Sequence, residues 1–325
     1  MKIKLYLKIV LYVVILFNSF KTSAQESPGE ADLIKAEEAM NAGNFEAWFQ
    51  FANKSCDQGN MFACFMVAKG YEPGMAANIP YPKIKDLAKA FGYYKKSGDL
   101  GFEAASYMAA EMYRLGEGVA ASNENALTYY KQAYLQGDSR ASNAIYQMLQ
   151  NPAPFITFLE ECVGKKYYPA ARELATIYIS GSLGEVNINK AMKWLRIGEQ
   201  NNHDGCLYVL GYLYRNGLKE ANGNFTMDQS AINIPKALEY YQKAANLGST
   251  EAMNNLAEMN LDGEGMAKNA NAAFDWFQKA CERDNGYSCY MCSWLLVNKM
   301  TTRQGDAAAF SSRSLELGYD PNAEN

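Results

Sequence analysis

One small or turn-forming position recurs along the chain at intervals of about 29 to 46 residues, and this repeat constrains the fold more than any other feature. We call this position the anchor. Eight residues before every anchor the chain carries an aromatic side chain. The anchors are Gly59, Gly101, Gly137, Lys166, Asn202, Gly248, Asp284 and Gly318. The aromatic residues are Phe51, Tyr93, Tyr129, Phe158, Trp194, Tyr240, Trp276 and Phe310.

A second helix is predicted after each of the first seven anchors. A small residue stands four positions after the anchor, and in four copies a tyrosine follows eight positions later. These spacings place both on one helical face, where the small residue lets two helices approach closely and the aromatic residue fills the gap between pairs. The small residues are Ala63, Ala105, Ala141, Ala170, Cys206, Ala252 and Ser288, and the tyrosines are Tyr71, Tyr113, Tyr178 and Tyr214.

The repeat therefore predicts an all-α protein of about eight antiparallel helix pairs, beginning near Asp32. A single pair cannot bury its apolar face, so neighbouring pairs must stack. The expected architecture is a right-handed α-solenoid. Pro169 and Pro235 fall where helices are expected to begin, a position that tolerates the missing N–H.

The clearest copies read ALTYYKQAYLQG and ALEYYQKAANLG, and several are preceded by a helix that ends in Tyr and a GxG turn. This pattern resembles the Sel-one-like repeat (SLR) family, whose members are related to tetratricopeptide repeats. The resemblance covers most of residues 40–318 and is best over 104–141 and 235–280. It weakens at 151–162, where Pro152 and Pro154 replace the GxG turn, at Asn260, and beyond Asn298.

The first 24 residues have the pattern of a cleavable secretory signal peptide. Three early lysines precede an apolar run at 9–17, and small residues end the segment at Ala24. The run is shorter than the roughly 20 residues of a membrane span, although an uncleaved anchor is the alternative. We expect an SLR domain at 25–325 that is secreted or periplasmic, with no membrane span after cleavage.

Charge and composition argue against several classes of function. The net charge of −4, which becomes more negative without the lysines of the first 24 residues, disfavours nucleic acid as a partner. A single histidine, His203, leaves little scope for metal or triad chemistry, and His203-Asp204 is interpreted as a polar helix start. We expect no cofactor and no metal.

Two cysteine pairs occupy equivalent positions in two repeats. Cys56 and Cys64 are eight residues apart, as are Cys281 and Cys289, and each pair brackets a turn between helices. In an exported protein such pairs favour disulfides, and the placement looks like that of secreted cysteine-rich SLR proteins. The alternative is four reduced, buried thiols. Cys162, Cys206 and Cys292 have no matching partner, and buried small thiols are the preferred interpretation over a redox or zinc site.

The resemblance implies that one helix of each pair lines a concave, partner-binding surface. Positions six and ten after each anchor lie one turn apart and are expected to face it, although packing between helices is an equal alternative for each residue. These positions include Glu111, Asn143 and Gln147. The residues predicted to bind a protein or peptide are Tyr107, Arg172, Tyr208, Tyr212, Asn254, Tyr290 and Trp294.

The sequence thus predicts an exported scaffold for protein–protein or protein–peptide interaction, without chemistry of its own. Two insertions, at 74–85 and 218–234, are either further binding surface or tolerated loops. The alternative function is a β-lactamase-like hydrolase or a penicillin- or peptidoglycan-binding protein, which the resemblance implies. The chain lacks the S-x-x-K tetrapeptide of serine β-lactamases, so the hydrolase has no mechanism in this sequence.

Overall fold

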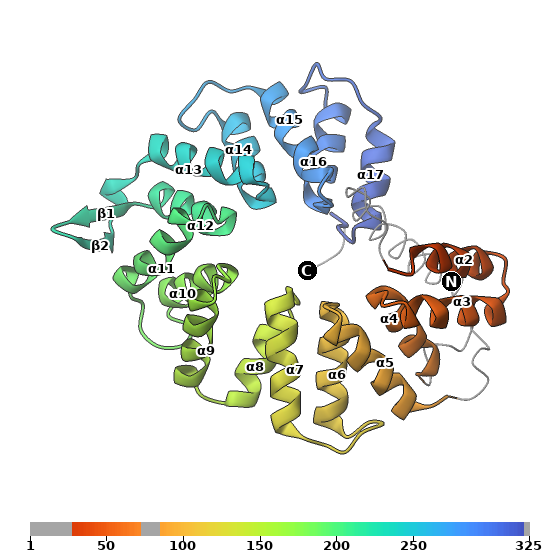
Figure 1. The fold of residues 1–325 in the computed structure, drawn as a ribbon. Helices are drawn as coiled ribbons and strands as arrows, with labels where there is room; N and C mark the ends of the chain where they lie inside the picture. Colours follow the sequence, from red (N-terminus) through yellow and green to blue (C-terminus); the bar gives the residue numbers. More distant parts are fainter. Residues whose placement is uncertain (1–27, 73–84, 322–325) are drawn as a thin grey trace. The chain divides into compact units, whose positions relative to one another are not determined.

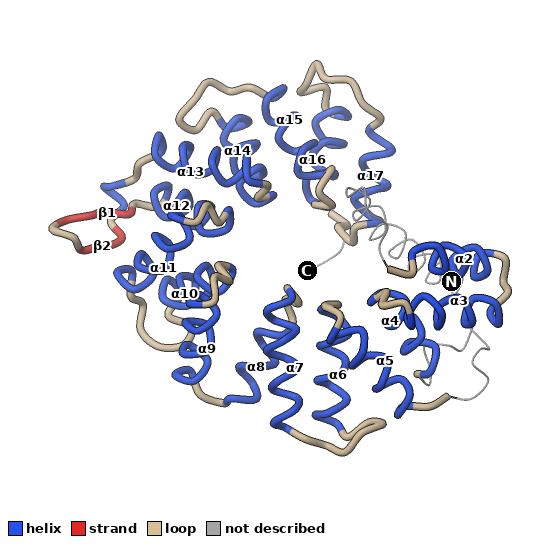
Figure 2. The backbone as a smooth tube through the Cα atoms, viewed as in Figure 1, coloured by secondary structure: helices blue, strands red, loops and turns tan. Residues whose placement is uncertain are grey.

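The computed structural model describes residues 28–72 and 85–321, which are mainly α-helical (Figures 1 and 2). The chain divides into two compact units, with the division between Gln150 and Asn151. The predicted signal peptide and most of the first insertion lie outside the described residues. The division falls where the SLR pattern weakens in the sequence.

Unit 1 contains seven helices within its described residues, each packed on the next along the chain. They are α2 (Glu30–Asn41), α3 (Phe45–Asp57), α4 (Met61–Tyr71), α5 (Leu87–Asp99), α6 (Glu103–Leu115), α7 (Asn123–Gln136) and α8 (Ala141–Leu149).

Unit 2 continues the same arrangement with nine described α-helices, a β-hairpin and a short 3-10 turn. The helices are α9 (Pro152–Gly164), α10 (Pro169–Ser180), α11 (Ile188–Gln200), α12 (Asp204–Arg215), α13 (Ile234–Leu247), α14 (Thr250–Asp262), α15 (Ala270–Cys281), α16 (Gly286–Val297) and α17 (Ala307–Glu316). The hairpin comprises β1 (Leu218–Ala221) and β2 (Asn224–Met227), and the turn is η1 (Gln229–Ala231).

The prediction of an all-α solenoid of about eight helix pairs is confirmed. All eight anchors have positive φ, and the first seven reverse the chain between two helices. All seven small residues after the anchors are completely buried, with 0 % of their surface exposed. Helices therefore meet in close contact at the positions that the spacing predicted.

Aromatic rings form contacts between successive helix pairs. None of the eight predicted rings is exposed. Three of them contact the tyrosine ring near the end of the preceding helix, with centroid distances of 5.5 to 5.8 Å. These pairs are Tyr71 with Tyr93, Tyr113 with Tyr129, and Tyr214 with Tyr240.

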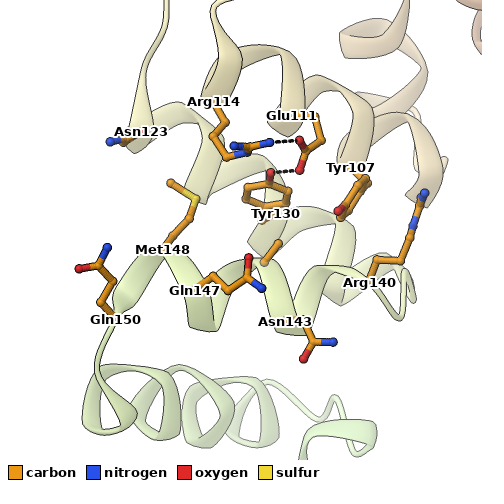
Figure 3. A pocket seen from close by; sticks show the side chains of 11 residues that line it. Tyr107, Glu111, Arg114, Asn123, Tyr130, Arg140, Asn143, Gln147, Met148 and Gln150 are labelled. Atoms are coloured by element: carbon orange, nitrogen blue, oxygen red, sulfur yellow. Dashed lines mark hydrogen bonds and ion pairs between the residues drawn. The ribbon is translucent and has the colours of Figure 1, made fainter.

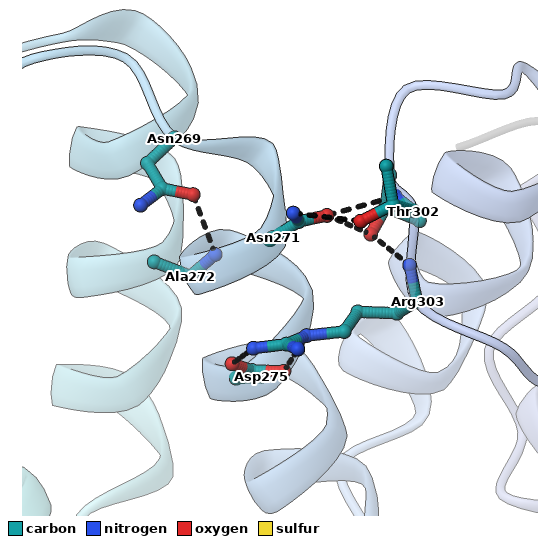
Figure 4. A network of polar contacts seen from close by, with 7 residues as sticks. Asn269, Asn271, Ala272, Asp275, Thr302 and Arg303 are labelled. Atoms are coloured by element: carbon teal, nitrogen blue, oxygen red, sulfur yellow. Dashed lines mark hydrogen bonds and ion pairs between the residues drawn. The ribbon is translucent and has the colours of Figure 1, made fainter.

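A polar network replaces the GxG turn before the last helix (Figure 4). Asn271 on α15 accepts hydrogen bonds from the Thr301 hydroxyl at 2.7 Å and the Thr302 backbone N–H at 2.8 Å. Arg303 forms a paired hydrogen bond and ion pair with Asp275, with distances of 2.8 and 2.5 Å. This network fixes the segment leading to α17, in the region where the repeat pattern is lost from the sequence.

The insertion at 218–234 adds the described strands, which the all-α prediction did not include. Its strands pair in register from Leu218 with Met227 to Ala221 with Asn224. Asn222 and Gly223 both have positive φ, as a two-residue turn of this hairpin type requires. The Asn-Gly dipeptide was therefore the sequence signal that could have predicted the hairpin.

Candidate partner-binding site

A cavity of about 620 Å³ lies among α6, α7 and α8 of unit 1 (Figure 3). Residues at positions six and ten after two consecutive anchors line it together: Tyr107 and Glu111 from α6, and Asn143 and Gln147 from α8. The repeat brings them together because each helix presents the same face as the one before it. Positions that the spacing placed on one helical face thus form one wall of the cavity.

An ion pair and two tyrosines form one side of the cavity. Arg114 donates to the Glu111 carboxylate at 2.6 Å, and the buried Tyr130 hydroxyl donates to the other oxygen of the same carboxylate. Burial of Glu111 disfavours its charged form, but the hydrogen bonds from Arg114 and Tyr130 outweigh burial and hold the pKa of Glu111 below its ordinary value. Glu111 is thus ionised and its oxygens are already occupied.

Arg140 forms a second fixed charge at the edge of the cavity. Its guanidinium contacts the buried Asp138 carboxylate through two hydrogen bonds of 3.0 and 2.5 Å. The same group lies over the ring of Tyr107, 4.1 Å from its centroid. Since Tyr107 also contacts the Tyr130 ring at 5.4 Å, both side chains are held in place before any ligand arrives.

Four amide side chains complete the lining and differ from these fixed groups. In the described part of unit 1, their amide groups make no hydrogen bond with another residue, and all four residues are exposed. They are Asn123, Asn143, Gln147 and Gln150. An amide offers both donors and an acceptor, so this part of the cavity can pair with peptide groups in either direction.

The six other predicted partner-binding residues lie in unit 2. Arg172 donates to Glu251 at 2.9 Å and lies 5.9 Å from the ring centroid of Tyr208. Tyr208 is half-buried, whereas Tyr212, one turn further along α12, is 48 % exposed. Arg172 and Tyr208 are therefore neighbours, and Tyr212 presents its ring to solvent.

The remaining three predicted residues divide between packing and exposure. Asn254 accepts a hydrogen bond from the Ser288 hydroxyl at 2.5 Å, so it joins α14 to α16. Tyr290 is half-buried beside Tyr319, with centroids 5.6 Å apart. Trp294 is 36 % exposed. Asn254 and Tyr290 thus have clear packing roles, while Trp294 is accessible.

Four of the lining residues were not predicted from the sequence: Arg114, Asn123, Tyr130 and Arg140. Each lies outside positions six and ten, and reaches the cavity from the end of α6, from α7 or from the loop before α8. Arg114 follows Glu111 by three residues, a spacing that places both on one helical face. That spacing was the available signal for Arg114; the position of Arg140 depends on the turn after Gly137 and has no such signal.

Both predicted cysteine pairs are at disulfide distance. The Sγ atoms of Cys56 and Cys64 are 2.06 Å apart, and those of Cys281 and Cys289 are 1.99 Å apart. The three other cysteines are buried and lie outside these disulfides, and burial raises the pKa of Cys206 and of Cys292 to about 12. Cys289 is thus paired across the turn to Cys281, and Cys292 is an unreactive core residue.

Metal-binding clusters and membrane-spanning helices are both absent from the residues that the structure describes. Within them, no three His, Cys, Asp or Glu side chains are grouped so that they could hold a metal ion. None of the described helices combines the length and the apolar character that crossing a bilayer demands.

The consecutive helix pairs, and the recurring repeat positions that line this cavity, define an α-helical solenoid repeat protein. The Sel1 repeat model matches five segments that together make up more than half of the chain, so the chain belongs to the Sel1 repeat family. Proteins of this family are generally protein-interaction scaffolds. The matched segments are residues 62–102, 103–138, 169–203, 205–249 and 250–285.

Individual relatives are distant. An uncharacterized protein of Neisseria meningitidis is 23 % identical over 239 residues, which span 73 % of this chain and 47 % of the relative. Cytochrome c oxidase assembly factor 7A of Xenopus laevis is 32 % identical over 110 residues, or 34 % of this chain and 42 % of that protein. The chain thus spans about half the length of the curated relatives it matches.

A solved structure of similar fold is c5321, a protective antigen of uropathogenic Escherichia coli strains with an SLR fold. It is 20 % identical to this chain, with a TM-score of 0.43 over 88 % of this chain and 63 % of the antigen.

Proposed function

We propose that this protein is an exported scaffold that binds a protein or peptide segment, and that the cavity among α6, α7 and α8 is part of its binding surface. One observation carries the proposal: the same two register positions of consecutive repeats, Tyr107 with Glu111 and Asn143 with Gln147, line one cavity. Its volume of about 620 Å³ falls in the range of ligand sites, roughly 300–1,000 Å³.

The energetics of the cavity suit recognition of an extended chain. The charged and aromatic groups are held by Asp138, Glu111 and each other, so little conformational entropy is lost when a ligand binds. The amide side chains of Asn143 and Gln147 remain available to pair with main-chain N–H and C=O groups. In unit 2, the exposed Tyr212 and Trp294 are proposed to contribute to the same kind of surface, together with the neighbouring Arg172 and Tyr208.

Two features support export. The pattern of residues 1–24 is that of a signal peptide, and both disulfides require an oxidising compartment to form and persist. We therefore propose a secreted or periplasmic location. Fractionation of cells that express the full chain should place a shortened protein, with an N-terminus after Ala24, outside the cytoplasm; an uncleaved protein in the cytoplasm would contradict it.

A site-specific photo-cross-linking experiment tests the proposed surface. A photoreactive phenylalanine analogue at Gln147 should cross-link a polypeptide partner in the native exported fraction, because this side chain lines the cavity. The same analogue at Gln50, an exposed glutamine on α3 away from the cavity, is the matched control. Equal cross-linking from both positions would reject the proposed surface.

Mutation of residues that line the cavity provides a second test of the proposed surface. The double change Asn143→Ala with Gln147→Ala should abolish cross-linking from a probe at Met148, whereas Gln50→Ala should leave it unchanged. Circular dichroism spectra of the variants serve as the control for correct folding. The alternative function has its own readout: turnover of a chromogenic cephalosporin by the purified protein would favour a β-lactamase-like enzyme.

A further inference from the structure

The β-hairpin inserted between α12 and α13 docks its tip on the helix α11. The backbone N–H of Phe225 donates to the Asn189 side-chain oxygen at 2.7 Å. The Phe225 ring also lies 5.6 Å from the guanidinium carbon of Arg196. The hairpin is thus held over one face of α11 and forms a wall that a repeat with a short turn does not have.

A cavity of about 340 Å³ lies between this hairpin tip and α11. Four residues of α11, spaced three, one and three apart, provide one side: Asn189, Met192, Lys193 and Arg196. Residues at this spacing lie on a single face of a helix. The tip residues 223–225 form the other side, where the half-buried Phe225 ring provides an apolar surface, whereas Met192 is only 1 % exposed.

The two cations of this face have unused hydrogen-bond donors. Arg196 forms ion pairs with Glu199 and Glu220 at 3.7 Å each, and at this distance neither carboxylate is hydrogen-bonded to its guanidinium. Glu199 also accepts a hydrogen bond from the Tyr240 hydroxyl at 2.7 Å, which holds it toward α13. Within the described residues, Lys193 forms no ion pair with a carboxylate.

Other arginines of unit 2 are bound differently. Arg215 donates to Glu264 and Asn255 at 2.5 to 3.0 Å, and Arg172 donates to Glu251 at 2.9 Å. Arg196 therefore differs from these two because its ion-paired carboxylates lie beyond hydrogen-bond distance. Because the whole chain has a net charge of −4, this pair of cations is a local feature and does not belong to a generally basic surface.

We propose that the cavity between α11 and the hairpin binds a small organic carboxylate. The carboxylate pairs with Arg196, whose planar fork matches two carboxylate oxygens, and is attracted by Lys193 one turn earlier. The apolar part of the ligand packs against the Phe225 ring. This site lies in unit 2, is built from other residues than the unit 1 cavity, and is independent of the proposed scaffold function.

Calorimetric titration of the oxidised, full-length protein tests the proposal, with N-acetylphenylalanine as the probe. We expect saturable 1:1 binding of this acid and no binding of its neutral amide, N-acetylphenylalaninamide, which has the same ring without the charge. Inorganic phosphate, which has the charge without the apolar group, should bind at least tenfold more weakly than the acid. Binding of the amide or of phosphate as tight as that of the acid would overturn the assignment.

Variants then assign the roles of the residues. Arg196→Gln should weaken binding of the acid about tenfold or more, since a charged hydrogen-bonded pair is lost. Phe225→Ala should weaken binding of the acid several-fold and leave binding of phosphate unchanged. Arg283→Gln, an exposed arginine of unit 2 outside the cavity, is the control and should have no effect. An equal loss with Arg283→Gln, or no binding by the wild-type protein, would overturn the proposal.

Discussion

At the scale of single residues, the anchors are defined by backbone conformation and only secondarily by residue type. Five of the eight are glycine, but Lys166, Asn202 and Asp284 take the same left-handed conformation, with φ of 66°, 53° and 63°. Asparagine and aspartate tolerate this region better than other residues with a Cβ, whereas lysine has no local hydrogen bond to offset the strain. Lys166 is therefore the most strained anchor.

Replacement of Lys166 by glycine should stabilise the protein. Relief of the left-handed strain, partly offset by the greater entropy of glycine in the unfolded chain, should raise the free energy of unfolding by about 0.5–1 kcal/mol. Lys165→Gly is the matched control: Lys165 has φ of −83°, so glycine there should be destabilising. Urea denaturation measures both, and equal effects at the two positions would contradict this explanation.

His203 caps the start of α12, as the interpretation of His203-Asp204 as a helix start predicts. Its Nδ1 accepts from the Cys206 backbone N–H at 3.2 Å, which requires the neutral ring. Burial and the positive charge of Arg172 lower the pKa of His203 below 6.5, and they outweigh the opposite effect of the Asp204 carboxylate. At pH values below 6.5, His203 therefore binds a proton more readily in the unfolded chain than in the folded chain. The folded state loses stability as the pH falls through this range.

The variant His203→Asn should remove this dependence, because asparagine caps a helix without titrating in this range. Between pH 7 and pH 5 the wild-type protein should lose more stability than the variant. Denaturant midpoints measured across this pH range give the comparison. Parallel curves for the two proteins would show that the pKa of His203 is the same in the folded and unfolded states.

At the scale of helices, close contact between backbones determines how each pair packs. On α5, Gly98 faces the start of α6, where a Cβ on Gly98 would lie 2.6 Å from the Ser106 hydroxyl and 2.9 Å from its backbone nitrogen. A Cβ on Gly92, which lies six residues earlier on the same helix, would meet no neighbouring atom within 4 Å. Two glycines of one helix thus have opposite structural roles.

Substitution of these glycines by alanine should change stability in opposite directions. Gly98→Ala should destabilise the protein by about 1–3 kcal/mol, since the Ser106 backbone must move. Gly92→Ala should stabilise it by about 1 kcal/mol through helix propensity alone. Thermal unfolding followed by circular dichroism separates the two, and a stabilising Gly98→Ala would mean that α5 and α6 are not in such close contact.

At the scale of the whole molecule, the chain consists of two units, each with its own core and its own disulfide. Cys56–Cys64 lies in unit 1 and Cys281–Cys289 in unit 2. The boundary after Gln150 falls in the stretch that no matched repeat covers. Pro152 and Pro154 at the start of α9 allow the first turn of a helix but not the continuation of a preceding one.

The two units should therefore fold separately. Fragments 25–150 and 151–325, produced under oxidising conditions, should each be helical and unfold cooperatively, because consecutive repeats bury their surfaces mainly on near neighbours. Circular dichroism of the equimolar mixture should approximate that of the intact chain. If either fragment is unfolded, its stability depends on residues of the other unit.

The sequence by itself determined the repeat, the helix pairs, the buried small residues and the cysteine pairs. These features follow from local periodicity: the anchor, the small residue and the ring recur at fixed spacings, and fixed spacings select a helical face. Tyr107, Glu111, Asn143 and Gln147 could be placed on a common face for the same reason.

Only the tertiary structure decided which of those faces enclose a cavity and which are used for packing. Arg140 reaches Tyr107 because a turn and the buried Asp138 direct its side chain, and Asn254 is used to bond Ser288. The hairpin cavity joins α11 to residues 223–225, some thirty positions away. Such contacts join segments whose separation has no period, so no local pattern encodes them.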